Sequence, residues 1–172
     1  MKLKMNSDTR KNIRPYRLYV MVGAPGSGKS TWALENISDA VYVSRDNIRY
    51  EHLQDGEDYF SHEKETFAIF IETIVLALIE KKVAIADATH LNLYARRKLL
   101  GAIDQQLRNQ YDIYFVCMNT SCEECLRRNS KKEGRAKIPD SAIKEMYDKL
   151  TKPKFEEHPS IKSIWVVEER SI

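Results

Sequence analysis

Residues 23 to 30 read Gly23-Ala24-Pro25-Gly26-Ser27-Gly28-Lys29-Ser30, which fits the pattern G-x-x-x-x-G-K-[ST] without a mismatch. Glycines let such a backbone curl until successive N–H groups point at a polyphosphate. Lys29 can reach the β- and γ-phosphates, and the Ser30 hydroxyl is placed to ligate Mg²⁺. A helix that begins here and continues through Thr31 adds its positive dipole end. The stretch predicts a nucleoside triphosphate site.

The neighbours of this loop have the order that a phosphate-binding loop requires. Leu18-Tyr19-Val20-Met21-Val22 is a short apolar run typical of a strand, and Trp32-Ala33-Leu34-Glu35 continues as a helix. A glycine-rich turn that matched only by chance would not need this setting. The context therefore favours the functional interpretation.

Size and composition limit the class of protein. The 172 residues fit one domain, and 42% hydrophobic with 31% charged residues is an ordinary globular composition. No run approaches the roughly 18 apolar residues of a membrane span, and the first residues lack the apolar segment of a secretory signal. We expect a cytoplasmic protein with no membrane partner.

Charge is uneven along the chain. The net charge is +3, and residues 1 to 17 hold six of the 28 basic residues but one of the 25 acidic residues. We expect residues 1–15 to be a flexible basic tail, with contact to nucleic acid as the alternative, and residues 16–172 to form the domain. The three cysteines are an odd number, which predicts reduced thiols rather than a zinc site at Cys122 and Cys125.

Apolar runs alternate with helix-like segments through the rest of the chain. Further strands are expected at Ala40–Ser44, Val83–Asp87, Ile113–Met118 and Ile164–Val167. Helices are expected after an N-cap at Ser61, over Tyr94–Asn109, after a capping box at Thr120-Ser121-Cys122-Glu123, and over Asp140–Leu150. This alternation predicts a three-layer α/β fold with a mainly parallel sheet of about five strands.

Polar residues gather where these strands end. The second strand ends at Arg45-Asp46-Asn47-Ile48-Arg49, and the next ends at Asp87-Ala88-Thr89-His90. Residues 127 to 137 hold six bases and one acid, enough for a cationic flap over a phosphoryl group. Because ligands bind at the carboxyl edge of parallel sheets, we expect these groups beside the phosphate loop.

These segments resemble the P-loop kinases of the phage-type 5′-hydroxyl polynucleotide kinase family from about Tyr16 to Leu150. Four landmarks occur in order, and Met146-Tyr147 follows the last of them. They are Gly-Ala-Pro-Gly-Ser-Gly-Lys-Ser-Thr-Trp at 23 to 32, Ser-Arg-Asp-Asn-Ile-Arg at 44 to 49, Asp-Ala-Thr-His at 87 to 90, and Arg-Arg-Asn-Ser-Lys-Lys-Glu-Gly-Arg-Ala-Lys-Ile-Pro at 127 to 139. The resemblance implies a P-loop kinase fold with a cationic helical lid, ATP and Mg²⁺ as donor and cofactor, and a 5′-hydroxyl RNA or DNA end as acceptor.

The resemblance also implies roles for single residues. Asp46 matches the general base that accepts the proton of the attacking hydroxyl, which agrees with a carboxylate's task of orienting that hydroxyl. Arg49 matches an arginine that grips the phosphate beside the accepting nucleotide, whereas an ordinary ion pair with Asp46 is the alternative. Independently of the resemblance, Asp87 closes a short apolar strand as a Walker B carboxylate does, so it is a candidate to organise Mg²⁺ or its water and to bind substrate; the family pattern varies around Asp87-Ala88. Thr89 and His90 could contact substrate, with a Thr89 hydroxyl that stabilises the loop as the alternative.

The lid is implied by the same resemblance. Arg128 and Arg135 match lid residues that close over ATP and act in catalysis together with Lys29. Lys132 stands where arginine is common, so the charge is kept and the bidentate geometry is lost. Which of Lys132 and Arg135 clamps the nucleotide is left open.

Three functions remain in view. The first is ATP-dependent phosphorylation of the 5′-hydroxyl of RNA or DNA, with Arg49 and bases such as Arg96 and Arg97 holding the acceptor. The second keeps the chemistry but transfers to a small metabolite or nucleotide sugar. The third is an ATPase switch without an acceptor. The sequence does not decide the oligomeric state.

Overall fold

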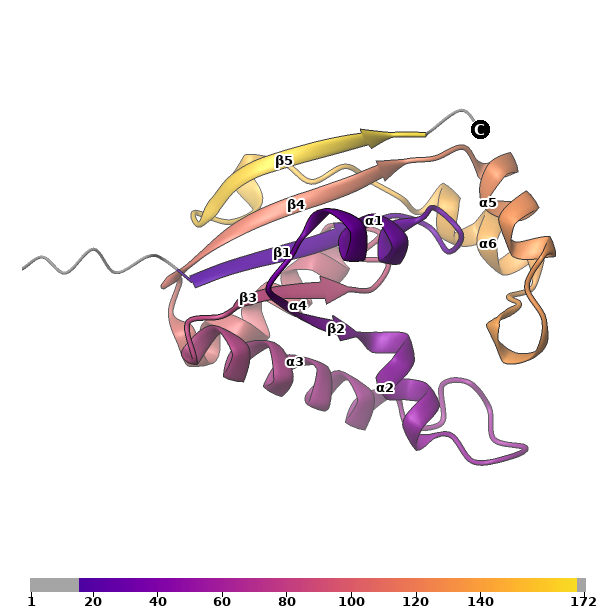
Figure 1. Ribbon diagram of the computed structural model, residues 1–172, viewed down its shortest axis with the longest axis horizontal. Coiled ribbons are helices and arrows are strands. Elements are labelled where there is room, and N and C mark those ends of the chain that lie inside the picture. Colours follow the sequence, from indigo (N-terminus) through magenta and orange to yellow (C-terminus); the bar gives the residue numbers. More distant parts are fainter. Residues whose placement is uncertain (1–15, 170–172) are drawn as a thin grey trace, which may run out of the picture.

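Five parallel strands form one sheet in the computed structural model, which describes residues 16–169 (Figure 1). The strands are β1 (Tyr16–Val22), β2 (Ala40–Ser44), β3 (Val83–Asp87), β4 (Tyr111–Asn119) and β5 (Ile161–Glu168). Their order across the sheet is β2-β3-β1-β4-β5, and every neighbouring pair is parallel. The prediction of a mainly parallel sheet of about five strands is confirmed.

Helices cover both faces of this sheet. They are α1 (Lys29–Asn36), α2 (Arg45–His52), α3 (Glu63–Ile79), α4 (Leu93–Leu107), α5 (Cys122–Ser130) and α6 (Asp140–Asp148), with short 3₁₀ turns η1 (Gly134–Ala136) and η2 (Phe155–Glu157). The main core lies between the sheet and the helices α3 and α4, and α1 packs on the other face through Ala33 and Trp32. The three-layer architecture is confirmed.

The long helix α3 has the predicted apolar face but a different start. Phe70, Ile74 and Leu78 are fully buried against the sheet, as their spacing indicates. Ser61 is not the N-cap, because its N–H bonds to the carbonyl of Asp58 in a preceding turn. The helix begins one residue after His62, with two acids in its first turn.

Two helices begin directly at the carboxyl edge of the sheet. The charged cluster expected after β2 forms the first turns of α2, capped by Ser44, whose hydroxyl accepts from the N–H of Asn47 at 3.3 Å. The cap of α5 is Ser121 rather than Thr120, which corrects the predicted capping box. The Thr120 hydroxyl donates instead to the Ser27 carbonyl at 2.9 Å, and this contact ties β4 to the phosphate loop.

The helices α5 and α6 and the segment between them form a lid at one end of the sheet. Figure 1 shows this orange segment and the purple loop after α2 on the same side of the molecule. Asn129 anchors the segment, because its side chain bonds to both the N–H and the carbonyl of Ile138, at 3.1 and 2.6 Å.

The structure bears differently on the expectations about the tail, the membrane and the cysteines. The basic tail, residues 1–15, lies outside the described residues. Between residues 16 and 169 no helix is long and apolar enough to cross a membrane. All three cysteines are free, and Cys122 and Cys125 lie in the first half of α5.

Candidate active site

The turn between β1 and α1 has the backbone shape of a phosphate-binding loop. Gly26 and Gly28 have φ angles of 83° and 90°, in the left-handed region that favours glycine. A Cβ on Gly26 would lie 2.6 Å from the carbonyl oxygen of Cys125 on α5. A Cβ on Gly28 would lie 3.1 Å from Nη1 of Arg128. Both glycines are therefore favoured by conformation, and Gly26 is also required by its close approach to the backbone of Cys125, whereas the Arg128 side chain near Gly28 can move.

Lys29 and Ser27 are buried inside this loop. The Lys29 ammonium donates to the Ala24 carbonyl at 3.0 Å. Its burial lowers its pKa below the ordinary 10.5, while the carboxylates of Asp87 and Asp46 act in the opposite direction. The Ser27 Oγ is buried and has no hydrogen-bond partner within residues 16–169. A phosphate oxygen would satisfy this hydroxyl and pair with this cation, so the loop fits a nucleoside triphosphate.

Asp87, at the end of β3, connects the phosphate loop to β2. Its Oδ2 accepts hydrogen bonds from the Ser30 hydroxyl, at 2.5 Å, and from the Tyr42 hydroxyl. Burial and the contact with Asp87 raise the pKa of Tyr42 to about 12, so the phenol stays protonated and donates. Tyr42 was not singled out from sequence, although it shares a strand face with Ser44, the residue in register with Asp87.

A divalent ion at this place would need ligands from the nucleotide. The described part of the chain holds no group of three or more His, Cys, Asp or Glu side chains that could bind a metal. Mg²⁺ in proteins commonly keeps several waters and binds one or two side chains together with substrate phosphates. Ser30 and Asp87, one hydroxyl and one carboxylate in contact, fit that role.

Asp46 and Arg49, both on α2, meet in a network of ion pairs. Nη1 of Arg49 donates to Oδ1 of Asp46 at 2.6 Å, and Nη2 donates to Glu63 at 2.6 Å. The Tyr59 hydroxyl donates to the same Oδ1 at 2.6 Å. Glu63 also pairs with Arg45. Neither Tyr59 nor Glu63 was predicted, because both approach from segments that follow α2 and carry no motif.

Exposure differs sharply within this network. The Asp46 side chain is 60% exposed, whereas that of Arg49 is 5% exposed. Nη1 of Arg49 also donates to the Tyr59 hydroxyl, at 2.7 Å. Arg49 therefore holds Asp46 in place here, and its Nε is buried without a hydrogen-bond partner among residues 16–169.

Thr89 and His90, which follow β3, form hydrogen bonds to the backbone of the phosphate loop and of β1. The Thr89 carbonyl accepts from the N–H of Gly23 at 3.0 Å. The buried His90 bonds through Nδ1 to the Met21 carbonyl at 2.7 Å, so Nδ1 carries the hydrogen. Burial lowers the pKa of His90 to about 4. These contacts shape the loop through the backbone.

The three predicted lid cations have different surroundings. Nη1 of Arg128 lies 3.4 Å from the Gly26 carbonyl, beside the phosphate loop. Lys132 is close enough to act on the pKa of Lys29, which it lowers. Arg135 points the other way and pairs with Asp55, at 2.7 Å, in the loop after α2. The lid thus contacts both the phosphate loop and the Asp46 side of the site.

Arg96 does not face an acceptor. Its side chain is 1% exposed and forms a two-pronged ion pair with Glu157, at 2.8 and 2.7 Å. Its Nη1 donates to the carbonyls of Thr151 and His90, at 2.8 and 3.2 Å. The expectation that Arg96 is a surface base near substrate is wrong, because its side chain is buried against Glu157. The sequence does not reveal this pair, since its two residues lie 61 positions apart.

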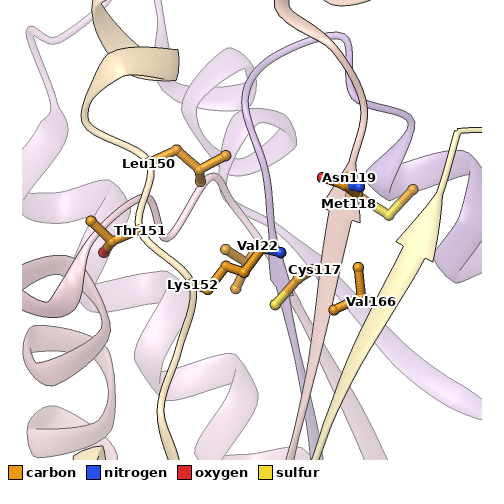
Figure 2. A pocket seen from close by; sticks show the side chains of 8 residues that line it. All are labelled: Val22, Cys117, Met118, Asn119, Leu150, Thr151, Lys152 and Val166. Carbon is orange, nitrogen blue, oxygen red and sulfur yellow. The ribbon is translucent and has the colours of Figure 1, made fainter.

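A small cavity lies beside the site without belonging to it. Figure 2 shows it between the ends of β1, β4 and β5 and the chain after α6, and its volume is about 40 Å³. This volume is enough for water and far too small for a nucleotide. Its lining is Val22, Cys117, Met118, Asn119, Leu150, Thr151, Lys152 and Val166.

The loop, its lysine and the neighbouring carboxylates define a P-loop nucleotide-binding protein. Residues 18–153 match the family described as an AAA domain. The chain belongs to this family. It also shares its fold with P-loop kinases.

Three solved structures place the fold more closely. A chain in the Pnkp1/Rnl/Hen1 RNA repair complex is 27% identical with a TM-score of 0.67, over 79% of this chain and 44% of that one. This chain therefore spans less than half the length of that relative. A sugar kinase from Janibacter sp. HTCC2649 is 18% identical with a TM-score of 0.55, and a putative kinase from Chloroflexus aurantiacus J-10-fl is 12% identical with a TM-score of 0.69. Each of these two matches covers 90% of this chain and 86% of the other.

Proposed function

We propose that the protein transfers the γ-phosphate of ATP to the 5′-hydroxyl of RNA or DNA. The observation that carries this proposal is the position of Asp46. Its carboxylate is exposed, yet it lies near enough to the phosphate-loop Lys29 to influence the pKa of that lysine. A phosphate-binding loop with an exposed carboxylate on the same side of the sheet supports this proposal, because a kinase needs both a donor site and a group that orients the acceptor hydroxyl.

Residues of the donor half bind and neutralise the triphosphate. Bound ATP with Mg²⁺ supplies the transferable phosphoryl group and part of the charge neutralisation. The backbone of residues 23–30 and Lys29 would hold the phosphates, the Ser30 hydroxyl would be a Mg²⁺ ligand, and Asp87 would hold a water of that ion. Arg128 and Lys132 lie on the lid side of the loop and neutralise charge on the phosphoryl oxygens.

On the acceptor half, Asp46 orients the hydroxyl and takes its proton. Oδ1 of Asp46 accepts a hydrogen bond from the Tyr59 hydroxyl, and the carboxylate is 60% exposed, which supports access by an acceptor hydroxyl. Arg49 fixes the carboxylate and offers a cationic fork for the phosphate next to the accepting nucleotide once a contact is released. The recorded contact of Thr89 with the phosphate loop is made by its backbone carbonyl, which accepts from the N–H of Gly23.

Transfer to a small metabolite is the second candidate. The sugar kinase that matches over 90% of this chain names such an acceptor, and the second kinase of the same extent names none. At 18% and 12% identity, however, they describe the fold and not the acceptor. The RNA repair chain is the more similar in sequence, and the four ordered landmarks point to a polynucleotide.

A transfer assay distinguishes the candidates. Labelled ATP is offered with 5′-hydroxyl RNA, 5′-hydroxyl DNA, nucleosides and free sugars, at two salt concentrations. We expect transfer to an oligonucleotide that weakens as salt rises. Transfer to sugars alone would establish the second candidate, and ATP hydrolysis unchanged by any acceptor would establish an ATPase.

The variant Asp46→Asn gives this assay its residue-level control. It should lower kcat by at least 100-fold while ATP affinity is retained, because the residue serves the acceptor. A loss of ATP affinity in place of a loss of kcat would contradict the assigned role.

A further inference from the structure

Three aromatic residues stand beside Asp46 and have no part in phosphoryl transfer. Tyr50 lies on α2, and Tyr59 and Phe60 lie in the loop that precedes α3. The Tyr59 ring meets the Phe60 ring edge to face, with centroids 4.9 Å apart and an interplanar angle of 88°. It also meets the Tyr50 ring at 6.1 Å. The cluster is therefore one continuous aromatic surface.

This surface is held in position by the network around Asp46. The guanidinium carbon of Arg49 lies 4.4 Å from the Tyr59 centroid and 5.6 Å from the Phe60 centroid. The Phe60 N–H donates to Oδ1 of Asp58 at 2.9 Å, and the Phe60 carbonyl accepts from the N–H of Glu63 at 3.1 Å. The Phe60 backbone is thus tied to a turn and to the start of α3.

Phe60 is nevertheless 57% exposed. Single exposed apolar side chains are common and need no explanation by themselves. Here the exposed ring is fixed at its backbone and lies against Tyr59 and Arg49, both of which bond to the carboxylate proposed to receive the acceptor hydroxyl. An aromatic ring presented beside cations is the arrangement that stacks unpaired bases of single-stranded nucleic acid.

We propose that the Phe60 ring, supported by Tyr59, is a stacking site for the base of the acceptor's 5′-terminal nucleotide. The site rests on the proposed function and extends it, since it names the acceptor as an unpaired end that carries a base. In one nucleotide the reacting 5′-hydroxyl and the base are attached to the same sugar. A carboxylate for the hydroxyl and a ring for the base, both around Tyr59, match that chemistry.

Two acceptors that differ only in one base test the proposal. The first is a 5′-hydroxyl oligonucleotide, and the second is the same molecule with an abasic 5′-terminal nucleotide. Because base stacking on an aromatic ring stabilises the complex, the wild-type protein should have a kcat/KM roughly tenfold higher for the intact oligonucleotide than for the abasic one. The variant Phe60→Ala should lose this preference and keep its activity on the abasic acceptor, while Phe60→Trp should keep the preference.

A matched control separates stacking from damage to the fold. Phe155, in η2, is 56% exposed and lies before the strand β5, away from the carboxyl edge. Phe155→Ala should leave the preference unchanged, and the melting temperatures of all variants should stay close to that of the wild type.

Different failures have different meanings. Equal efficiency of the wild type on both acceptors, or equal loss on both in Phe60→Ala, overturns the stacking site while the proposed function stands. No transfer to either acceptor overturns the proposed function and the stacking site together. Transfer to a free sugar that depends on Phe60 also overturns it, because the ring would then be packing against a sugar.

Discussion

Burial of His90 makes the stability of the protein depend on pH. Its pKa falls from 6.5 to about 4, because the ring is buried and charge inside the core is costly. Above pH 6.5 the ring is neutral in both the folded and the unfolded chain, so its burial has no pH-dependent cost there. As pH falls from 6.5 towards 4, the unfolded chain gains a proton that the folded chain does not, and stability is lost.

We predict that this loss amounts to roughly 3 kcal/mol in the free energy of unfolding, given the gap between the two pKa values. Urea unfolding of the wild type and of His90→Asn from pH 7 to pH 4 measures it. Asparagine suits the φ of 41° at this position and keeps a donor for the Met21 carbonyl. Unfolding energies that fall equally in both proteins would exclude His90 as the cause.

The Tyr59 hydroxyl donates a hydrogen bond to Oδ1 of Asp46, the carboxylate that the proposed function assigns to the acceptor hydroxyl. Under the proposed function, Tyr59→Phe should lower the KM for the acceptor by roughly two- to tenfold, the worth of one hydrogen bond, and should change kcat little. Steady-state kinetics with varied acceptor measures this. Tyr50→Phe is the control, because that hydroxyl donates to the Arg135 carbonyl and not to Asp46. A higher KM in Tyr59→Phe would mean that the phenol helps to hold the acceptor.

Among single residues, the sequence predicts those that are part of a motif and misses those that contact a motif residue only in the folded protein. Lys29, Ser30, Asp46 and Asp87 were predicted, and they lie at one edge of the sheet, although their roles remain proposals. Tyr59 was missed because it lies 13 residues after Asp46, in a loop whose course depends on tertiary contacts.

Among the elements, the phosphate loop and α5 are packed so closely that one added methyl group should lower the stability of the protein. Gly26→Ala should lower the free energy of unfolding by about 3 kcal/mol, from strain at positive φ and from the contact with Cys125. Gly56 has a φ of 85°, and a Cβ there meets nothing within 4 Å, so Gly56→Ala should cost about 1 kcal/mol. Chemical denaturation compares the two. Equal losses would show that backbone strain alone matters at Gly26.

The buried ion pair of Arg96 and Glu157 joins α4 to η2 and to the chain after α6. Arg96→Met should lower the free energy of unfolding by about 3–5 kcal/mol, because Glu157 is left buried without its partner. Arg97→Met, at an exposed position one residue further along α4, should change it by less than about 0.5 kcal/mol.

Adding Glu157→Leu to Arg96→Met tests the reason for that loss. The double variant should recover part of the stability, since the uncompensated carboxylate is gone. Recovery should remain incomplete, because the carbonyls of Thr151 and His90 still lack their donor. No recovery at all would mean that packing rather than charge is lost.

Strands and helices were predicted well because their apolar spacing is a local property. The strands β2 and β3 have the predicted bounds, and the main helices differ by a few residues at their ends. Helix starts were less predictable. Ser61 and Thr120 both have good capping side chains, but Ser61 lies in a turn before the N-cap His62, and the Thr120 hydroxyl donates to the phosphate loop instead. Such competition is not visible in sequence.

For the whole molecule, nucleotide binding should depend on pH through Lys29. Burial lowers its pKa below 10.5 in the empty protein, and a bound polyanion raises that pKa again. Affinity is therefore full below the pKa of the empty protein and falls as pH rises through it, in a window that opens below pH 10.5. The upward shift of melting temperature on adding ATP should shrink as the pH becomes alkaline. Lys29→Met should show a smaller shift that no longer changes over this range.

The strand order sets the spacing between the phosphate loop and Asp46. The phosphate loop leaves β1 and Asp46 follows β2, with β3 between them. Neighbouring strands are about 4.8 Å apart, so two ladders of backbone hydrogen bonds set a span of roughly 10 Å between the donor strand and the acceptor strand. Backbone ladders do not depend on side-chain identity. The spacing between the phosphate loop and the start of α2 is thus set by the sheet, and under the proposed function a different acceptor could be accommodated by changes in the loops while this spacing stays the same.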